Sequence, residues 1–184
     1  YGPRFPSTLY ADKGNARTIR TTDFCGVDGI NLTTAPAATL DQGMVEEHAL
    51  CEGDFLLSRS GEYAGKTRVF FPAVEDRFIA AAFLIRYRLA QTELRPKYLH
   101  YICSSPIGQS VLSSLVQGSA QPNIAGSAFS ALKIPVPPIE EQDHVISVID
   151  DLSNADRVAS ERLTKSRALM GAMLAAMQEV QHVQ

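Results

Sequence analysis

One segment, residues 60–67 (SGEYAGKT), combines residue types that could bind a phosphate. It differs at one position from the phosphate-binding pattern GxxxxGK[ST], with a serine in place of the first glycine, and it follows a segment with strand character. A phosphate-binding loop must open a helix whose first backbone amides hold the phosphates. Residues 68–72 (RVFFP) are instead β-branched or aromatic and end in proline, which predicts a strand. Nucleotide hydrolysis is therefore the weaker interpretation of this segment.

The same segment can instead be the turn of a hairpin between two strands. The hairpin would carry basic and hydroxyl side chains at its tip, namely Arg59, Ser60, Lys66, Thr67 and Arg68. Such a tip can approach phosphates closely, and an arginine can bind the edge of a guanine with both arms of its guanidinium. A solvated turn that keeps a sheet edge soluble is the plainer alternative. The segment thus predicts either a contact with nucleic acid or an ordinary turn.

The residue patterns of other enzymes and of metal sites are missing from the sequence. It contains no GxSxG, GxGxxG or [DN]PP[YF] pattern. Its three cysteines form no CxxC pair, and its four histidines are scattered. Their spacing therefore predicts neither a disulfide framework nor a metal site. We expect no catalytic residues, no metal and no cofactor in this chain.

The charge balance limits where a nucleic acid could bind. The net charge is −3, whereas phosphate contacts need lysine and arginine. Residues 139–184 contain eight acidic and four basic residues, and residues 1–138 contain twelve acidic and thirteen basic ones. Any positive surface must therefore be a local patch within residues 1–138. Because no apolar run is long enough to span a bilayer and the first twenty residues lack a signal-peptide core, we expect a soluble, cytoplasmic protein.

The composition changes at residues 134–138 (IPVPP), which predicts a domain over residues 1–138 and a helix over residues 139–184. Within the domain, short apolar and aromatic segments predict strands, at residues 54–59, 67–71 and 78–88, although the Ala-rich start of the third can equally be helical. Two later segments have proline near their first turn and predict helices, at residues 96–104 and 106–117. Strands followed by helices indicate an α+β fold with a mixed sheet.

The last part of the sequence has the heptad pattern of a coiled coil. Pro138, followed by Glu140, Glu141 and Asp143, predicts a helix start. Spacings of four and three then alternate over five heptads through Val145, Ile149, Leu152, Asp156, Ala159, Leu163, Ser166, Met170, Met173, Met177 and Val180. A helix of this length would extend ~65 Å and needs a partner helix to cover its apolar seam. Asp156 and Ser166 would restrict which partner and register it accepts. An amphipathic helix that folds back on its own domain is the alternative.

Four segments, in chain order, resemble the specificity subunits of type I restriction-modification systems. The N-terminal segment has Tyr1-Gly2 and then RTTDF at residues 20–24, and residues 53–61 (GDFLLSRSG) look like the central strand and turn of that family. Residues 118–124 (GSAQPNI) and 132–142 (LKIPVPPIEEQ) resemble the end of its recognition domain and the start of its helix. The junction PPIEEQ, followed by a long heptad helix, is the most specific of these features.

The resemblance implies a non-catalytic target-recognition domain that reads one part of a split DNA site. A full specificity subunit of this family holds two such halves, whose long helices pack antiparallel. The implied partners are double-stranded DNA, modification subunits that carry S-adenosylmethionine, and a restriction subunit driven by ATP. This chain would then be a C-terminal fragment of a two-domain subunit, or a half-subunit that pairs with a second copy of itself.

By position in this resemblance, several residues are expected near DNA. They are Arg20, Thr21, Arg59, Ser60, Lys66, Thr67, Arg68, Gln117, Ser119, Gln121 and Asn123. The polar loop at residues 117–123 can also be a connection held by its own hydrogen bonds. Two other functions stay open: a coiled-coil adaptor that binds protein and no DNA, and, less favoured, a nucleotide-binding enzyme.

Overall fold

The computed structural model describes residues 1–72, 74–90, 93–118 and 122–181, with side chains to residue 173. The chain divides into two compact units, which we call the N-terminal unit (Tyr1–Asp143) and the helical unit (His144–Gln184). Among the described residues, no helix has both the length and the apolar character needed to cross a membrane.

A three-stranded antiparallel sheet lies at the centre of the N-terminal unit. Its middle strand β6 (Phe55–Ser58) pairs with β7 (Thr67–Val69) on one side and with β9 (Leu84–Tyr87) on the other. All four residues of β6 are buried, since Phe55 and Leu57 face one apolar cluster while Leu56 faces another. This burial on both faces accounts for the nearly unbroken apolar sequence of the strand.

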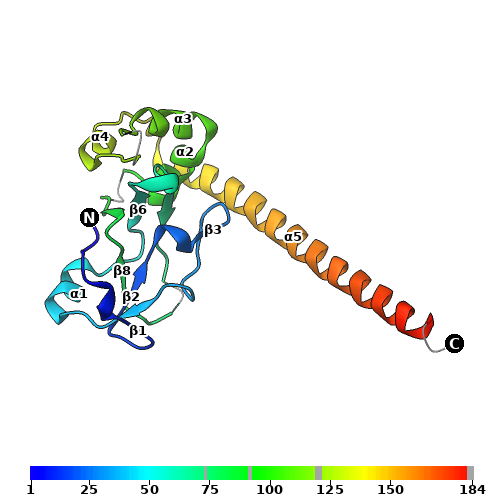
Figure 1. Ribbon diagram of the computed structural model, residues 1–184. Coiled ribbons are helices and arrows are strands. Elements are labelled where there is room, and N and C mark those ends of the chain that lie inside the picture. Colours follow the sequence, from blue (N-terminus) through cyan, green and yellow to red (C-terminus); the bar gives the residue numbers. More distant parts are fainter. Residues whose placement is uncertain (73, 91–92, 119–121, 182–184) are drawn as a thin grey trace. The chain divides into compact units, whose positions relative to one another are not determined.

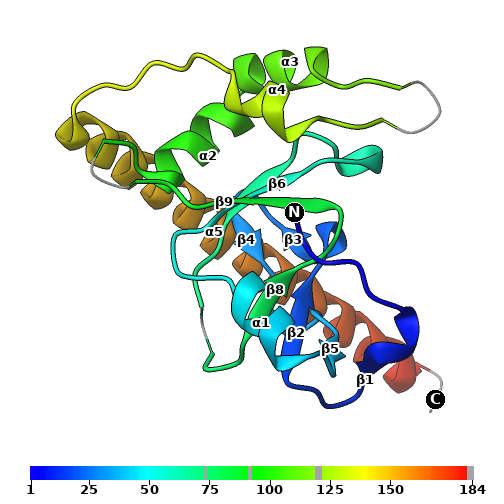
Figure 2. The same ribbon diagram turned by 90° about the vertical axis from the view of Figure 1, so that its left-hand side faces the viewer.

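Helices and a second sheet cover the two faces of this central sheet (Figures 1 and 2). Helices α2 (Pro96–Ser104), α3 (Pro106–Ser114) and α4 (Gly126–Ser130) supply Leu99, Leu112 and Phe129 to the cluster that contains Phe55. The second sheet contains β1 (Tyr10–Ala11), β5 (Ala37–Ala38), β2 (Ala16–Ile19) and β8 (Phe78–Ala80), in that order. Helix α1 (Gln42–His48) and the hairpin of β3 (Phe24–Cys25) and β4 (Gly29–Ile30) complete the unit.

The α+β class with a mixed sheet is confirmed, because β2 and β8 run parallel whereas the other pairs are antiparallel. The helix predicted over residues 96–104 matches α2, while α3 ends at Ser114, three residues before the predicted end. The single strand predicted over residues 78–88 is wrong. A turn divides it into β8 and β9, which belong to different sheets, and the turn residues Ala81–Phe83 include no glycine or proline that would have indicated it.

The long helix α5 (Ile139–Gln181) begins inside the N-terminal unit, where Gln142 anchors its first turn. The Gln142 side chain is fully buried. Its Nε2 donates to the carbonyl oxygens of Glu93 and Pro137 at 2.8 Å each, and its Oε1 accepts from the amide of Arg95 at 2.9 Å. The Arg95 guanidinium also donates to both carboxylate oxygens of Asp143, at 2.8 and 2.9 Å. The glutamine of the PPIEEQ segment therefore connects the start of the helix to the loop before α2.

Candidate functional site

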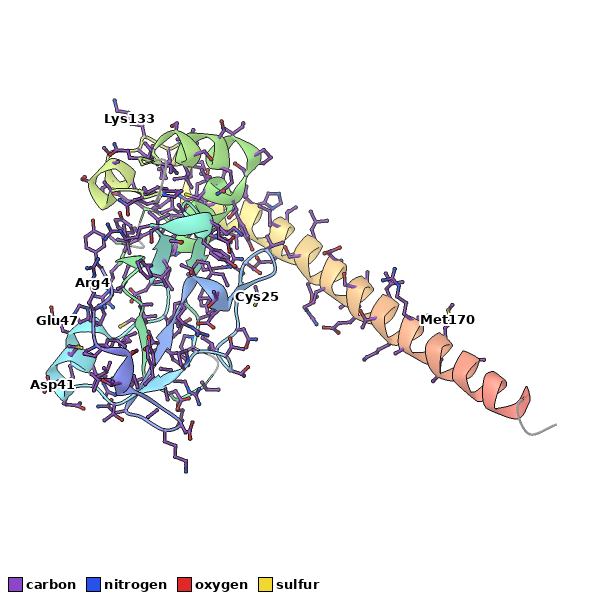
Figure 3. The ribbon with its side chains drawn as sticks, in the orientation of Figure 1. Arg4, Cys25, Asp41, Glu47, Lys133 and Met170 are labelled. Atoms are coloured by element: carbon purple, nitrogen blue, oxygen red, sulfur yellow. The ribbon has the colours of Figure 1, made fainter. Side chains whose placement is uncertain are left out.

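An open groove of about 790 Å³ crosses the surface of the N-terminal unit where its N-terminal segment passes the ends of β2 and β8. Polar, basic and aromatic side chains line it together: Pro3, Arg4, Phe5, Tyr10, Thr18, Arg20, Thr21, Thr22, Ala81, Ala82 and Phe83. Arg20 and Thr21, both predicted from the sequence, therefore lie on one wall. Arg4 lies on the opposite side of this unit from Cys25 (Figure 3). The groove combines cations, hydroxyl groups and three aromatic rings, of which Phe83 is half exposed.

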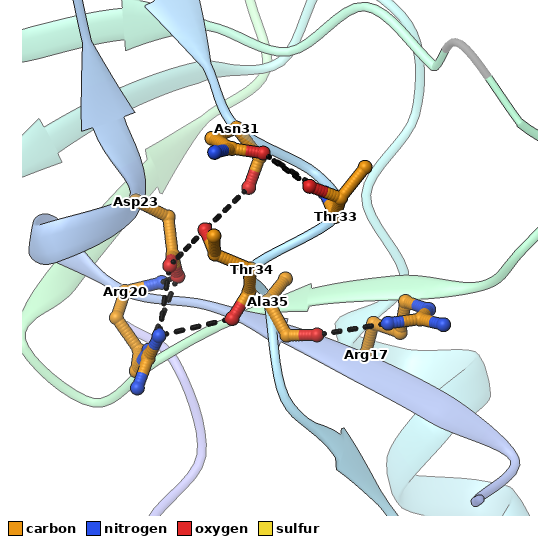
Figure 4. A network of polar contacts seen from close by, with 7 residues as sticks. All are labelled: Arg17, Arg20, Asp23, Asn31, Thr33, Thr34 and Ala35. Atoms are coloured by element: carbon orange, nitrogen blue, oxygen red, sulfur yellow. Dashed lines mark hydrogen bonds and ion pairs between the residues drawn. The ribbon is translucent and has the colours of Figure 1, made fainter. Parts of the chain in front are cut away.

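The orientation of Arg20 is fixed by the buried carboxylate of Asp23 (Figure 4). Arg20 Nε and Nη2 donate to the two oxygens of this carboxylate, at 3.2 and 2.8 Å, and Nη2 also donates to the carbonyl of Thr34 at 3.0 Å. Burial alone would raise the pKa of Asp23, but the hydrogen bonds from Arg20 and the Thr34 hydroxyl outweigh it and lower that pKa. Asp23 thus stays ionised and holds Arg20 at the groove.

A second group, the Arg59 cluster, consists of Tyr1 and four of the predicted residues, Arg59, Ser60, Gln117 and Asn123. Arg59 Nε donates to Asn123 Oδ1 at 3.0 Å, and the guanidinium carbon lies 4.7 Å from the centroid of the Tyr1 ring. Asn123 pairs through its backbone with Gln117, by two hydrogen bonds of 2.9 Å, and bridges to Ser60. The fold therefore brings together four predicted residues from two loops more than fifty positions apart.

The Arg59 cluster adjoins the groove through the backbone. The amide of Arg59 donates to the carbonyl of Phe83 at 2.9 Å, and the amide of Gly2 donates to the carbonyl of Leu84 at 3.1 Å. Phe83 lines the groove, and Tyr1 stacks on Arg59. The groove and the cluster therefore form one surface, which we call the candidate face.

The connection between β6 and β7 carries the predicted Lys66. It contains a short 3₁₀ turn (Gly61–Tyr63), and both Gly61 and Gly65 have positive φ values, of 73° and 88°, which suit glycine. Lys66 is exposed, and its ammonium lies 4.7 Å from the centroid of the Tyr63 ring. As predicted, a strand and no helix follows Thr67, so this segment lacks the helix N-terminus on which a phosphate-binding loop depends.

Thr67 and Arg68 are buried, with relative exposures of 1% and 7%, and their polar groups are engaged inside the fold. The Thr67 hydroxyl lies 2.9 Å from Nδ1 of the buried His100. The Arg68 guanidinium donates from Nη1 to Thr67, from Nε to Gly29 and from Nη2 to Gly26, all carbonyl oxygens at 2.7–2.9 Å. Burial lowers the pKa of Arg68. These two side chains therefore join β7 to α2 and to the β3–β4 hairpin, away from the candidate face.

Sequence reasoning missed three side chains of the candidate face, Tyr1, Arg4 and Phe83. Tyr1 carries part of the family resemblance but was not expected near DNA, and Arg4 and Phe83 belong to no local motif. Only the pairing of distant segments places all three beside Arg20 and Arg59. Ser119 and Gln121, which the sequence predicts near DNA, lie outside the described residues.

The predicted seam of the long helix lies on α5, and most of its large apolar side chains are exposed. Leu152, Leu163, Met170 and Met173 have relative exposures of 65%, 52%, 60% and 59%. Met170 projects from the helix in Figure 3. Val145, Asp156, Ala159 and Ser166 are also exposed, and Ile149 is partly buried, whereas the side chains of Met177 and Val180 lie outside the described residues.

A family model, a curated relative and several solved structures all relate this chain to type I restriction-modification specificity subunits. The sequence model of the "Type I restriction modification DNA specificity domain" matches residues 2–165. A curated relative, the type I restriction enzyme MjaVIII specificity subunit of Methanocaldococcus jannaschii, is 28% identical over 103 residues, which are 56% of this chain and 23% of that protein.

Solved structures share the fold at lower identity. The S subunit of a type I restriction-modification system from M. genitalium aligns with a TM-score of 0.56 at 17% identity, over 86% of this chain and 37% of that one. The HsdS subunit of Thermoanaerobacter tengcongensis gives a TM-score of 0.58 at 21% identity, over 88% and 35%. A chain from a study of complex assembly and conformational transition of the type I R-M system gives 0.65 at 19% identity, over 91% and 38%. The present chain thus spans less than two fifths of each of these relatives.

Proposed function

The chain belongs to the type I restriction-modification DNA specificity family, and from this premise we propose that it reads one part of a bipartite DNA site through the candidate face. The observation that carries the proposal is the continuity of the groove and the Arg59 cluster. Together they present Arg4, Arg20 and Arg59 beside threonine hydroxyls and amide side chains. Cations of this kind bind phosphates, and arginine and amide side chains read base edges.

The proposed role does not require chemistry from this chain. The segment that resembles a phosphate-binding loop forms a hairpin connection, and its Thr67 is buried against His100. We therefore propose a non-catalytic specificity subunit, or part of one, that docks modification subunits. S-adenosylmethionine and ATP would be bound by those modification subunits and by a restriction subunit.

The same proposal assigns the exposed seam of α5 to pairing with another helix. A half-site reader needs a second reader at a fixed distance, and a long rigid helix can set that distance. The second helix would come from another copy of this chain or from a second recognition half. Asp156 and Ser166, which are exposed on α5, would select its register.

A salt titration tests the DNA-reading role. The full chain, assembled with modification subunits, should shift duplex DNA of mixed sequence in an electrophoretic assay. The affinity should fall steeply as salt rises, because each lysine or arginine that binds a phosphate displaces counterions from the DNA. The double variant Arg4→Ala and Arg20→Ala should weaken this binding and make its salt dependence shallower. A protein-binding adaptor would show no such dependence, and that result would reject the proposal.

A further inference from the structure

We infer that Arg59 binds a guanine of the recognised DNA sequence through its two terminal nitrogens, with Asn123 and Tyr1 holding it in position. This inference rests on the proposed function, since it assumes that the candidate face reads DNA.

The contacts of Arg59 leave one end of its guanidinium available. Its Nε is bound to Asn123 Oδ1 at 3.0 Å, and one face of the group lies over the Tyr1 ring at 4.7 Å. Its backbone is fixed on both sides, by the bond to Phe83 and by a 2.7 Å bond from the amide of Ile124 to its carbonyl. Within the described part of the chain, Nη1 and Nη2 have no hydrogen-bond partner. The free pair of donors is therefore held in one orientation.

The other arginines that the sequence predicts near DNA do not present such a pair. Arg20 uses Nε and Nη2 on Asp23 and Thr34, so that only Nη1 stays available. Arg68 uses all three of its nitrogens on backbone carbonyls and is buried. Arg59 therefore differs from both, because it alone of the three keeps two parallel donors.

Two parallel donors match guanine better than the other bases. In the major groove guanine presents two adjacent acceptors, O6 and N7, whereas adenine presents N7 beside the N6 donor group. An adenine at this position would direct its N6 hydrogen toward a guanidinium donor. Because Arg59 is already oriented, little rotamer freedom is lost on binding, and this favours the bidentate contact.

Asn123 acts here as a positioning residue, because its side chain holds Arg59 and need not touch the base. Its own backbone is fixed by the two hydrogen bonds to Gln117 and by the bridge to Ser60. An acceptor oxygen at this position is the feature that matters. Aspartate retains such an oxygen, whereas alanine removes it.

A selection experiment tests the inference. The full chain, assembled with modification subunits, selects from duplexes with randomised positions, and each variant is compared with the wild type. The wild type should select a sequence in which at least one position is guanine, preferred by about 5- to 150-fold. Arg59→Ala and Arg59→Lys should both lose that one preference and keep the others. Arg59→Lys preserves the positive charge. If both variants lose the guanine preference, that preference depends on the two parallel donors of the guanidinium and not on its charge.

A modified base and the Asn123 variants complete the test. Replacement of the selected guanine by 7-deazaguanine, which lacks the N7 acceptor, should lower wild-type affinity about fivefold or more and leave Arg59→Ala unaffected. Asn123→Ala should weaken the guanine preference. Asn123→Asp should retain it, although its negative charge lowers affinity for every sequence.

The possible failures are distinguishable. If the wild type selects no sequence, the proposed DNA-reading function fails. If it selects a sequence whose preferences both Arg59 variants leave intact, or if 7-deazaguanine has no effect on the wild type, only the role of Arg59 is overturned. The measurement with 7-deazaguanine uses unmodified protein and stays decisive even where a variant folds poorly.

Discussion

The N-terminal unit and the helical unit bury their apolar side chains to very different extents. Phe55, Leu56 and Leu57 on the central strand are fully buried, whereas Leu152, Leu163 and Met170 on α5 are each more than half exposed. A lone helix has no second surface within its own unit on which to bury an apolar face. The N-terminal unit therefore contains an apolar core of its own, whereas the apolar side chains of α5 stay exposed, and the proposed pairing with another helix would cover them.

The polar side chains of the two units differ in the same way. In the N-terminal unit Asp23, Asp54 and Gln142 are buried, and each forms several hydrogen bonds that fix one segment against another. On α5 the seam residues Asp156 and Ser166 are exposed. A polar residue in the seam of an unpaired helix stays hydrated, so it costs little stability. When two helices pair, it disfavours every register in which it lies against an apolar side chain. The buried polar groups of the N-terminal unit stabilise its own fold, whereas those on the predicted seam of α5 are free to act in the proposed pairing.

The largest effect is expected from the double variant Leu163→Asp and Met170→Asp. Two charges placed in an apolar seam must be desolvated when helices pair, so the isolated chain should change from a dimer to a monomer. Light scattering or sedimentation measures this change. Unfolding of the N-terminal unit should not shift, since its core is separate.

A matched control is the pair Thr164→Asp and Ala168→Asp, which adds the same charge at positions outside the predicted seam. This control should remain dimeric. A wild-type monomer, or a control that dissociates as readily as the seam variant, would contradict the proposed pairing.

The next largest effect is expected in the core of the N-terminal unit. The Phe55 ring is fully buried and lies 5.7 Å from the Phe129 ring and 6.3 Å from the Tyr87 ring, between centroids. Phe55→Ala should lower the free energy of unfolding by about 3–5 kcal/mol, measured by urea denaturation, and leave helix pairing intact. Phe83→Ala removes the same side chain from a half-exposed position and should change stability by less than about 0.5 kcal/mol. Similar losses for both variants would remove the contrast between core and surface.

A pH titration probes the buried polar contacts of the same unit. Burial, reinforced by the nearby charge of Arg68, lowers the pKa of His100 from 6.5 to about 4. Between these two pH values the unfolded chain binds a proton at His100 that the folded chain does not bind. Burial of neutral His100 therefore contributes fully to the free energy of unfolding above pH 6.5, and this contribution is lost as the pH falls from 6.5 toward 4. The loss should reach about 3 kcal/mol in denaturation curves.

His100→Asn keeps an acceptor for the Thr67 hydroxyl and removes the titration, so its stability should vary less between pH 6.5 and 4. Asp23 has a lowered pKa and therefore loses its stabilising effect only at more acidic pH, below the window of His100. An unchanged slope in the asparagine variant would show that other groups titrate in this range.

Local signals allowed several elements to be predicted from the sequence. The apolar run around Phe55, the proline at the start of α2 and the Pro138 junction each depend on neighbouring residues alone. The turn between β8 and β9 could not be predicted, because Ala81–Phe83 are as apolar as the strands beside them. The short strands from β1 to β5 have two to four residues each, too few for a periodic pattern.

The candidate site shows the same division between local and distant information. The hairpin tip and Lys66 follow from glycines close by in the sequence, whereas the groove depends on the parallel pairing of β2 with β8, which places Arg20 near Phe83. The burial of Arg68 could not be predicted either, because two of the carbonyls that bind it, those of Gly26 and Gly29, belong to the β3–β4 hairpin, about forty positions earlier. Composition alone cannot distinguish an arginine that binds DNA from one that binds backbone carbonyls.

The smallest effect is expected from Lys66, which is exposed in the β6–β7 connection of the N-terminal unit. Lys66 touches the Tyr63 ring and lies in solvent, so Lys66→Ala should leave stability within about 0.5 kcal/mol. If its ammonium binds a phosphate, affinity for every DNA sequence should fall by a similar factor, and the slope of log affinity against log salt should decrease by about one. Arg77→Ala removes the same charge just before β8, at the other end of that strand from the groove, and should leave the slope unchanged. If the wild type, Lys66→Ala and Arg77→Ala show the same slope of log affinity against log salt, Lys66 lies outside the DNA-binding surface. Phosphate contact would then be confined to the groove and the Arg59 cluster.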